Sequence, residues 1–144
     1  MTDDLQNKQP DSVPVTDKLY RLDEEYEYCW ELLDTRYRIV IPAGFIYDGA
    51  SIPRFVWTLT GLRPDGLHRA GALVHDWIYR HKGKLPASSH QYLDKNGQWR
   101  NVIGQWSRKD ADRMFARLMR EFGVSKFRRR MAYRGVRLFG WMSW

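Results

Sequence analysis

The pattern of apolar and polar positions first predicts a pair of strands. From residue 26 onward every second residue is aromatic or aliphatic, which is the period of a strand with one buried face: Tyr26, Tyr28, Trp30 and Leu32. The alternation resumes after a short turn at Asp34 and Thr35: Tyr37, Ile39 and Ile41. Residues 26–42 are therefore predicted to form an antiparallel hairpin. Residues 43–53 contain two glycines, directly follow Pro42 and end at Pro53, which indicates a loop of defined shape.

Helical spacing follows from about residue 67. One apolar stripe recurs every three or four residues, as on the packed face of a helix: Leu67, Ala70, Val74 and Ile78. A second stripe lies about 100° around the same helix: His68, Ala72, His75 and Tyr79. Ala70, Gly71 and Ala72 are small enough to let another backbone come close.

Two further helices are predicted after a polar excursion at residues 82–106, which holds a hairpin signal at Asn96 and Gly97. Ser107 followed by Asp110 resembles a capping box and begins the next helix. Its apolar stripe ends before Gly123: Ala111, Met114, Phe115, Leu118 and Phe122. Ser125 is a cap for the last helix, whose packed side is predicted to hold Phe127, Met131, Arg134 or Gly135, Leu138 and Met142.

Together these elements predict an α+β domain, with an N-terminal antiparallel β-hairpin or small sheet packed on about three helices. Residues 1–18 are polar and without period, so we expect a mobile arm there and a single domain over residues 19–144. The arm has no apolar segment of the kind a signal peptide needs, which predicts that the chain stays in the cytoplasm of the cell that makes it. With 43% hydrophobic residues and seven Trp the chain has ample side chains for a core. A single cysteine, Cys29, rules out an internal disulfide.

The net charge of +7 is concentrated at the end of the sequence. Residues 126–144 contain no acidic residue and six basic ones: Lys126, Arg128, Arg129, Arg130, Arg134 and Arg137. Such a segment suits a polyanion, whether nucleic acid, anionic lipid or an acidic protein surface. An ordinary solvated helix face is the simpler alternative.

Candidate chemistry gathers around His75. Asp76 is its neighbour on the predicted helix, Tyr79 lies one turn further, and Asp112 borders the apolar stripe of the following helix. A carboxylate placed there needs hydrogen-bond donors. If the helices pack antiparallel, His75 and Tyr79 can supply them, and a His oriented by an Asp is a general-base arrangement. A buried network that only ties two helices together is the alternative.

A metal site is a third possibility for the same region. Nitrogen and oxygen ligands for a divalent ion are present, without the spacing of a known zinc motif: Asp48, His68, His75, Asp76 and Asp112.

Five short motifs, in order over residues 19–141, resemble a small domain of unknown function found in tailed phages and prophages. They are VIPAGF at residues 40–45, DGASIPR at 48–54, HDWIY at 75–79, ADRMF at 111–115 and VRLFG at 136–140. The resemblance implies a phage or prophage origin.

A second, local resemblance is to phospholipases A2, through His75-Asp76-x-x-Tyr79 and a following Asp112. It implies that His75 is the catalytic base, that Asp112 orients it with the help of Tyr79, and that Asp76 binds Ca²⁺. The remaining calcium ligands would come from a glycine-rich loop, for which residues 48–51 or 61–66 are the candidates.

Three functions follow from these observations. The first is a phospholipase A2-like hydrolase at a membrane surface, with the basic last helix and Trp141 as its anchor. The second is a tail or baseplate component of the virion, in which the His, Asp and Tyr are structural and the basic end docks on other phage proteins. The third is a nucleic-acid-binding module that uses the arginines on phosphates: Arg128, Arg129, Arg130, Arg134 and Arg137.

Overall fold

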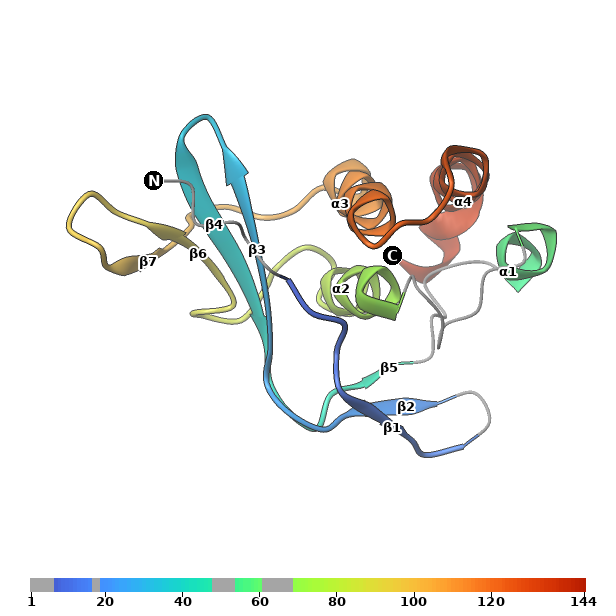
Figure 1. Ribbon diagram of the computed structural model, residues 1–144, viewed down its shortest axis with the longest axis horizontal. Coiled ribbons are helices and arrows are strands. Elements are labelled where there is room, and N and C mark those ends of the chain that lie inside the picture. The colour runs from blue at the N-terminus through green and yellow to red at the C-terminus, as the bar shows by residue number, and fades with distance from the viewer. Residues whose placement is uncertain (1–6, 17–18, 48–53, 61–68) are drawn as a thin grey trace.

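The computed structural model describes residues 7–16, 19–47, 54–60 and 69–144. Within these residues the chain forms two antiparallel sheets and four α-helices, which confirms the predicted α+β class. The four-stranded sheet stands on one side of the molecule and the helices on the other, with the smaller sheet below α2 (Figure 1).

The larger sheet is built from two hairpins joined edge to edge. Its order is β3-β4-β6-β7 and every neighbouring pair is antiparallel. The strands are β3 (Tyr26–Leu32), β4 (Thr35–Ile41), β6 (His90–Leu93) and β7 (Trp99–Asn101). Both predicted hairpins are therefore confirmed. The first turn is Leu33–Asp34, one residue earlier than expected, and both residues have positive φ (49° and 63°), as a two-residue hairpin turn requires.

The alternating residues of β3 and β4 form the face of the sheet that packs on the helices. Tyr26, Tyr28 and Trp30 are buried, whereas Glu27 and Glu31 between them are exposed. Tyr28 lies opposite the fully buried Ile39 of β4. The period of two in the sequence thus becomes one buried face.

A smaller sheet is formed near the N-terminus. Its order is β1-β2-β5, from Ser12–Pro14, Tyr20–Leu22 and Ile46–Tyr47. Part of the stretch expected as a mobile arm is therefore a strand, and the backbone carbonyl oxygen of Lys8 accepts a hydrogen bond from the Tyr26 hydroxyl at 2.7 Å. Strand β1 is held by backbone hydrogen bonds to β2. Such pairing leaves no mark in the side-chain pattern, so a polar sequence does not predict it.

The helices are α1 (Arg54–Thr60), α2 (Arg69–Arg80), α3 (Arg108–Glu121) and α4 (Lys126–Phe139), and α4 runs into a 3₁₀ turn, η1 (Gly140–Ser143). The two predicted serine caps are confirmed, because Ser107 accepts from the Asp110 amide at 3.1 Å and Ser125 from the Arg128 amide at 3.4 Å. Each cap satisfies an amide that the first turn leaves without a helical partner. Helix α1 was not predicted from the sequence.

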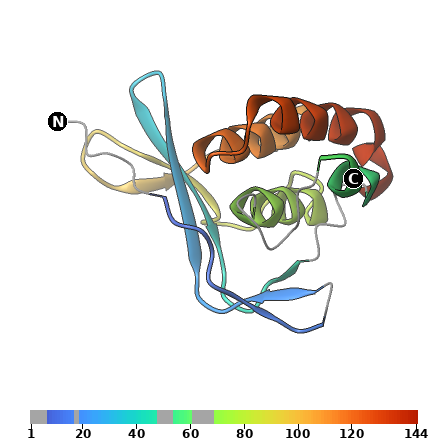
Figure 2. The same cartoon turned by 45° about the vertical axis from the view of Figure 1, so that its right-hand side comes forward.

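Helix α2 is central. Every residue from Ala70 to Tyr79 is buried, because the helix lies between the sheets and the other helices (Figure 2). Gly71 lets α3 come close, as a Cβ atom there would lie 3.2 Å from the Phe115 ring. Polar groups on such a helix need internal partners.

Helix α4 packs on a side whose buried residues share only Gly135 with the expected stripe. Phe127, Leu138 and Met142 of the predicted packed stripe are 71%, 66% and 62% exposed. The buried residues of α4 are Ala132, Gly135 and Val136. Helix α1 packs on α4 at this face, where the small side chains let the two helices come close together. The side of α4 that allows this close packing is the one that is buried.

Candidate functional site

Three buried residues, His75, Tyr79 and Asp112, and two half-buried ones, Arg108 and Arg137, form one group of hydrogen bonds and ion pairs, called here the carboxylate cluster. His75 Nε2 on α2 lies 2.7 Å from Asp112 Oδ1 on α3, and both side chains are 0% exposed. The Tyr79 hydroxyl donates to the same carboxylate oxygen at 2.5 Å. The contacts predicted from the two helical stripes are confirmed.

The other carboxylate oxygen of Asp112 faces two arginines. Arg137 Nη1 of α4 lies 2.8 Å from Oδ2, and Arg108 Nη1 lies 3.5 Å from it. Arg108 also donates to the carbonyl oxygens of Val136 and Arg137, at 2.9 and 3.0 Å. This ion pair draws one guanidinium nitrogen of Arg137 inward but leaves the side chain 29% exposed, and the expected contact of Arg137 with a membrane or polyanion stays a prediction.

The electrostatics of the cluster keep Asp112 charged. Burial alone would raise the pKa of Asp112, but hydrogen bonds from His75, Tyr79 and Arg137 outweigh it, and the pKa is lowered. Burial, followed by the neighbouring carboxylate, raises the pKa of the Tyr79 hydroxyl. Asp112 is thus an acceptor and Tyr79 a donor at neutral pH.

Aromatic rings and the end of the chain cover the cluster. The Tyr79 and Phe115 ring centroids lie 4.1 and 5.1 Å from that of His75. The Trp144 ring meets Tyr79 edge-on at 5.0 Å, and a Cβ atom on Gly140 would lie 2.8 Å from the Tyr79 hydroxyl. Residues 140–144 therefore lie directly against the tyrosine of the cluster.

The predicted metal ligands are only partly within the described residues. Asp76 is buried at 4% exposure on α2, while Asp48, His68 and both candidate calcium loops lie outside the described residues. Among the described residues no three His, Cys, Asp or Glu side chains gather as a metal site. Calcium binding stays a prediction.

The predicted polyanion-binding residues lie mostly on the exposed side of α4. Arg128, Arg130 and Arg134 are exposed and Arg129 is half-buried. Between and beyond them stand exposed apolar side chains: Phe127, Leu138, Phe139, Trp141 and Met142. We call these exposed basic and apolar residues the outer face of α4. No helix of the described chain is both long and apolar enough to cross a bilayer.

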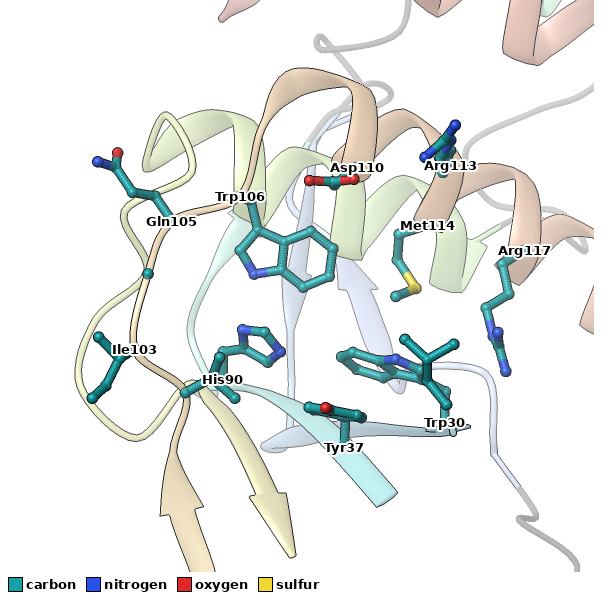
Figure 3. Close-up of a pocket in the computed structure, with 13 residues that line it drawn as sticks. Trp30, Tyr37, His90, Ile103, Gln105, Trp106, Asp110, Arg113, Met114 and Arg117 are labelled. Carbon is teal, nitrogen blue, oxygen red and sulfur yellow. The ribbon is translucent and has the colours of Figure 1, made fainter. Parts of the chain in front are cut away.

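One feature was missed by the sequence analysis: a cleft of about 560 Å³ between the larger sheet and α3. Four rings line it, from β3, β4, β6 and the residue before the α3 cap (Figure 3): Trp30, Tyr37, His90 and Trp106. Trp30 and Tyr37 were assigned only to packing, and His90 and Trp106 lay in the polar excursion. Their gathering depends on the pairing of β4 with β6, which no local pattern indicates.

Residues 20–136 match a protein family described as "Protein of unknown function (DUF1353)". No curated protein and no solved structure matches the chain.

Proposed function

Because the chain belongs to the DUF1353 family, whose description assigns no activity, its function must come from its own residues, and we propose that it hydrolyses lipid esters at a membrane surface. One observation carries the proposal: the 2.7 Å contact between His75 Nε2 and Asp112 Oδ1, with Tyr79 on the same oxygen. An ionised carboxylate on one imidazole nitrogen fixes the tautomer and stabilises the imidazolium that forms when the other nitrogen accepts a proton.

The proposed reaction uses water as the nucleophile. His75 Nδ1 takes a proton from a water molecule while the water oxygen attacks the ester carbonyl carbon. The carbon–oxygen bond to the leaving alcohol then breaks, and the imidazolium returns the proton to the leaving oxygen. Asp112 stabilises the imidazolium throughout, for which its lowered pKa is suited.

The outer face of α4 supports the choice of a membrane surface. Three exposed arginines attract anionic headgroups, and exposed rings of the kind found at the bilayer interface stand beside them. This face leads into η1, whose Trp141 and Met142 are exposed while Gly140 and the following Trp144 pack on Tyr79. Insertion of Trp141 into a bilayer would draw residues 140–144 away from the cluster. Such an opening is required, since His75 is wholly buried.

Calcium is not given a step in this reaction. No three His, Cys, Asp or Glu side chains of the described residues gather around Asp76, and calcium remains an expectation of the phospholipase resemblance. Activity is accordingly measured with calcium and with a chelator.

The burial of the cluster favours a second candidate, the virion component. Asp112 is 0% exposed and contacts His75, Tyr79 and Arg137, which is also what a purely structural tie between α2, α3 and α4 requires. In a tail or baseplate protein the outer face of α4 would then contact an acidic partner.

The substitution His75→Gln separates these functions. The Gln amide can still donate to Asp112, but it cannot accept a proton from water. We expect wild-type protein to hydrolyse phospholipids in anionic vesicles, and His75→Gln to lose activity by about 10²-fold or more while keeping its circular dichroism spectrum.

The matched control is His81→Gln, since His81 bonds the Trp77 carbonyl oxygen outside the cluster. It should retain full activity. A wild-type chain without hydrolysis in either calcium condition would reject the hydrolase and leave the virion component. So would a folded His75→Gln variant that is as active as wild type.

A further inference from the structure

We propose that the cleft between the larger sheet and α3 binds the bases of single-stranded nucleic acid, and that an adjoining arginine groove holds its phosphates. This binding site is separate from the carboxylate cluster, and the proposal does not depend on the hydrolase.

The cleft offers ring faces for stacking, chiefly from the half-buried Tyr37, His90 and Trp106, whereas Trp30 is only 6% exposed. Trp30 stacks on Tyr37 and on His90 with centroids 5.7 Å apart in each case, and these three rings form a floor on the sheet. Trp106 stands at an angle to them, 6.1 Å from Trp30 and 5.0 Å from His90 (Figure 3). Unpaired bases stack on such side chains regardless of sequence, because every base has a ring face.

Two ring nitrogens in the wall of the cleft point to a polar ligand. His90 Nε2 and Trp106 Nε1 are buried and make no hydrogen bond within the described part of the chain. Burial lowers the pKa of His90 to about 4, so the ring is neutral at physiological pH. Buried polar nitrogens are normally paired, and the edge of a base carries both donors and acceptors that pair with these nitrogens once the two rings turn toward the cleft.

A basic groove continues from the cleft. Arg113 and Arg117 line both hollows and follow each other by one turn of α3. The groove, of about 700 Å³, adds further basic residues: Arg120, Lys126, Arg129 and Arg130. The two acidic residues of the lining already accept hydrogen bonds within the protein. Asp110 accepts one from Ser107, and Glu121 accepts from Tyr28 and Asn7. Phosphates of a strand whose bases enter the cleft would thus meet arginines.

The combination selects one partner class. A duplex keeps its base faces stacked inside the helix and cannot present them to the rings. An acidic peptide would use the arginines but gain little from four aromatic rings, and an apolar chain would leave the two ring nitrogens without partners. A single strand uses the rings, the nitrogens and the arginines together.

The test is a fluorescence anisotropy titration of the full chain with a labelled dodecamer of thymidine, repeated over a series of salt concentrations. We expect saturable binding at low salt. Arg113→Gln with Arg117→Gln should weaken binding and flatten the slope of log K against log salt by about 1.4, since each phosphate contact contributes about 0.7 on a single strand.

Stacking is tested separately with Tyr37→Leu, which should weaken binding about 5- to 150-fold, the range for one stacked base. Tyr133→Leu, a half-buried tyrosine of α4 outside both hollows, and the pair Arg128→Gln with Arg134→Gln on the outer face of α4 are the controls and should bind as wild type.

Competition identifies the ligand class. Unlabelled single strand should displace the probe at lower concentration than the same mass of duplex, polyglutamate or anionic vesicles. Equal displacement by polyglutamate, an unaltered Kd for Tyr37→Leu, or no binding by wild type at low salt would each overturn the proposal.

Discussion

Asp112 is the residue that joins the helices at the centre of the molecule. Its two oxygens contact side chains from α2, α3 and α4. The sequence was sufficient to predict His75 and Tyr79 as its partners, because helical spacing puts them on one stripe of α2. It could not predict Arg108 and Arg137. Five basic residues of α4 besides Arg137 were equally plausible, and only the crossing of α3 and α4 decides which one reaches the carboxylate.

Replacing Asp112 by Asn should lower the free energy of unfolding at pH 7 by about 3 to 5 kcal/mol, because it leaves inward-facing guanidinium groups without their counter-charge. Urea denaturation followed by circular dichroism measures the loss. Asp23→Asn, an exposed change with the same chemistry, should fall within about 0.5 kcal/mol of wild type. Equal stability of the two variants would show that the cluster does not stabilise the fold.

The stability of wild type and that of Asp112→Asn should also differ in how they depend on pH. The pKa of Asp112 is lowered in the folded state, so its contribution is present above the unfolded pKa of about 4 and is lost as pH falls through the folded value. The gap in melting temperature between wild type and Asp112→Asn should therefore shrink in acid. A gap that stays constant from pH 7 to pH 3 would contradict the assignment.

Among the elements, α4 shows where periodicity misleads. Its large apolar residues recur at helical spacing and predict a packed stripe, yet the packed face is the one with Ala132, Gly135 and Val136. Short side chains let α1 approach α4 closely. The close contact along the whole helix pair buries more surface than one large side chain on a less closely packed face would. By contrast the strands β3 and β4 and the caps of α3 and α4 were predictable, because their signals are local.

Gly135→Ala tests this close approach. A Cβ atom there would lie 2.3 Å from Val56 Cγ2 of α1, so the change should cost about 1 to 3 kcal/mol of stability despite the higher helix propensity of Ala. Adding Val56→Ala removes the clashing methyl groups. The double variant should be less destabilised than the sum of the two single changes by at least 0.5 kcal/mol in thermal and urea unfolding. Strict additivity would show that α1 and α4 do not meet there.

At the scale of the whole molecule, positive charge is divided between two surfaces. Arg113, Arg117 and Arg120 of α3 face the groove, with Lys126, Arg129 and Arg130 at its far end. Arg128 and Arg134 stand with exposed apolar residues on the outer face of α4, and the exposed Arg130 lies at the border and belongs to both surfaces. The sequence showed the charge of the last segment but not this division, since α3 joins the basic surface only through its packing on α4.

Removal of charge from the outer face should weaken membrane adsorption. Arg128→Gln, Arg130→Gln and Arg134→Gln together should reduce partitioning onto vesicles rich in anionic lipid by about 10²-fold, at about 1 kcal/mol per arginine. Vesicle sedimentation measures this. The variant Arg21→Gln, Lys84→Gln, Lys95→Gln removes the same net charge from exposed sites outside α4 and should partition nearly as wild type. Equal losses in the two triple variants would show that only net charge matters.

The pairing of β4 with β6 also sets an order for folding during synthesis. The β3–β4 hairpin is local and can form as soon as residue 41 has left the ribosome, but its next neighbour, β6, begins only at residue 90. Until then the hydrogen-bonding edge of β4 has no strand beside it, and until the first helix forms the rings of Tyr28 and Trp30 have nothing packed against them. The nascent hairpin is therefore the species most prone to pair with another chain, and rapid formation of α2, which precedes β6, is what shields it.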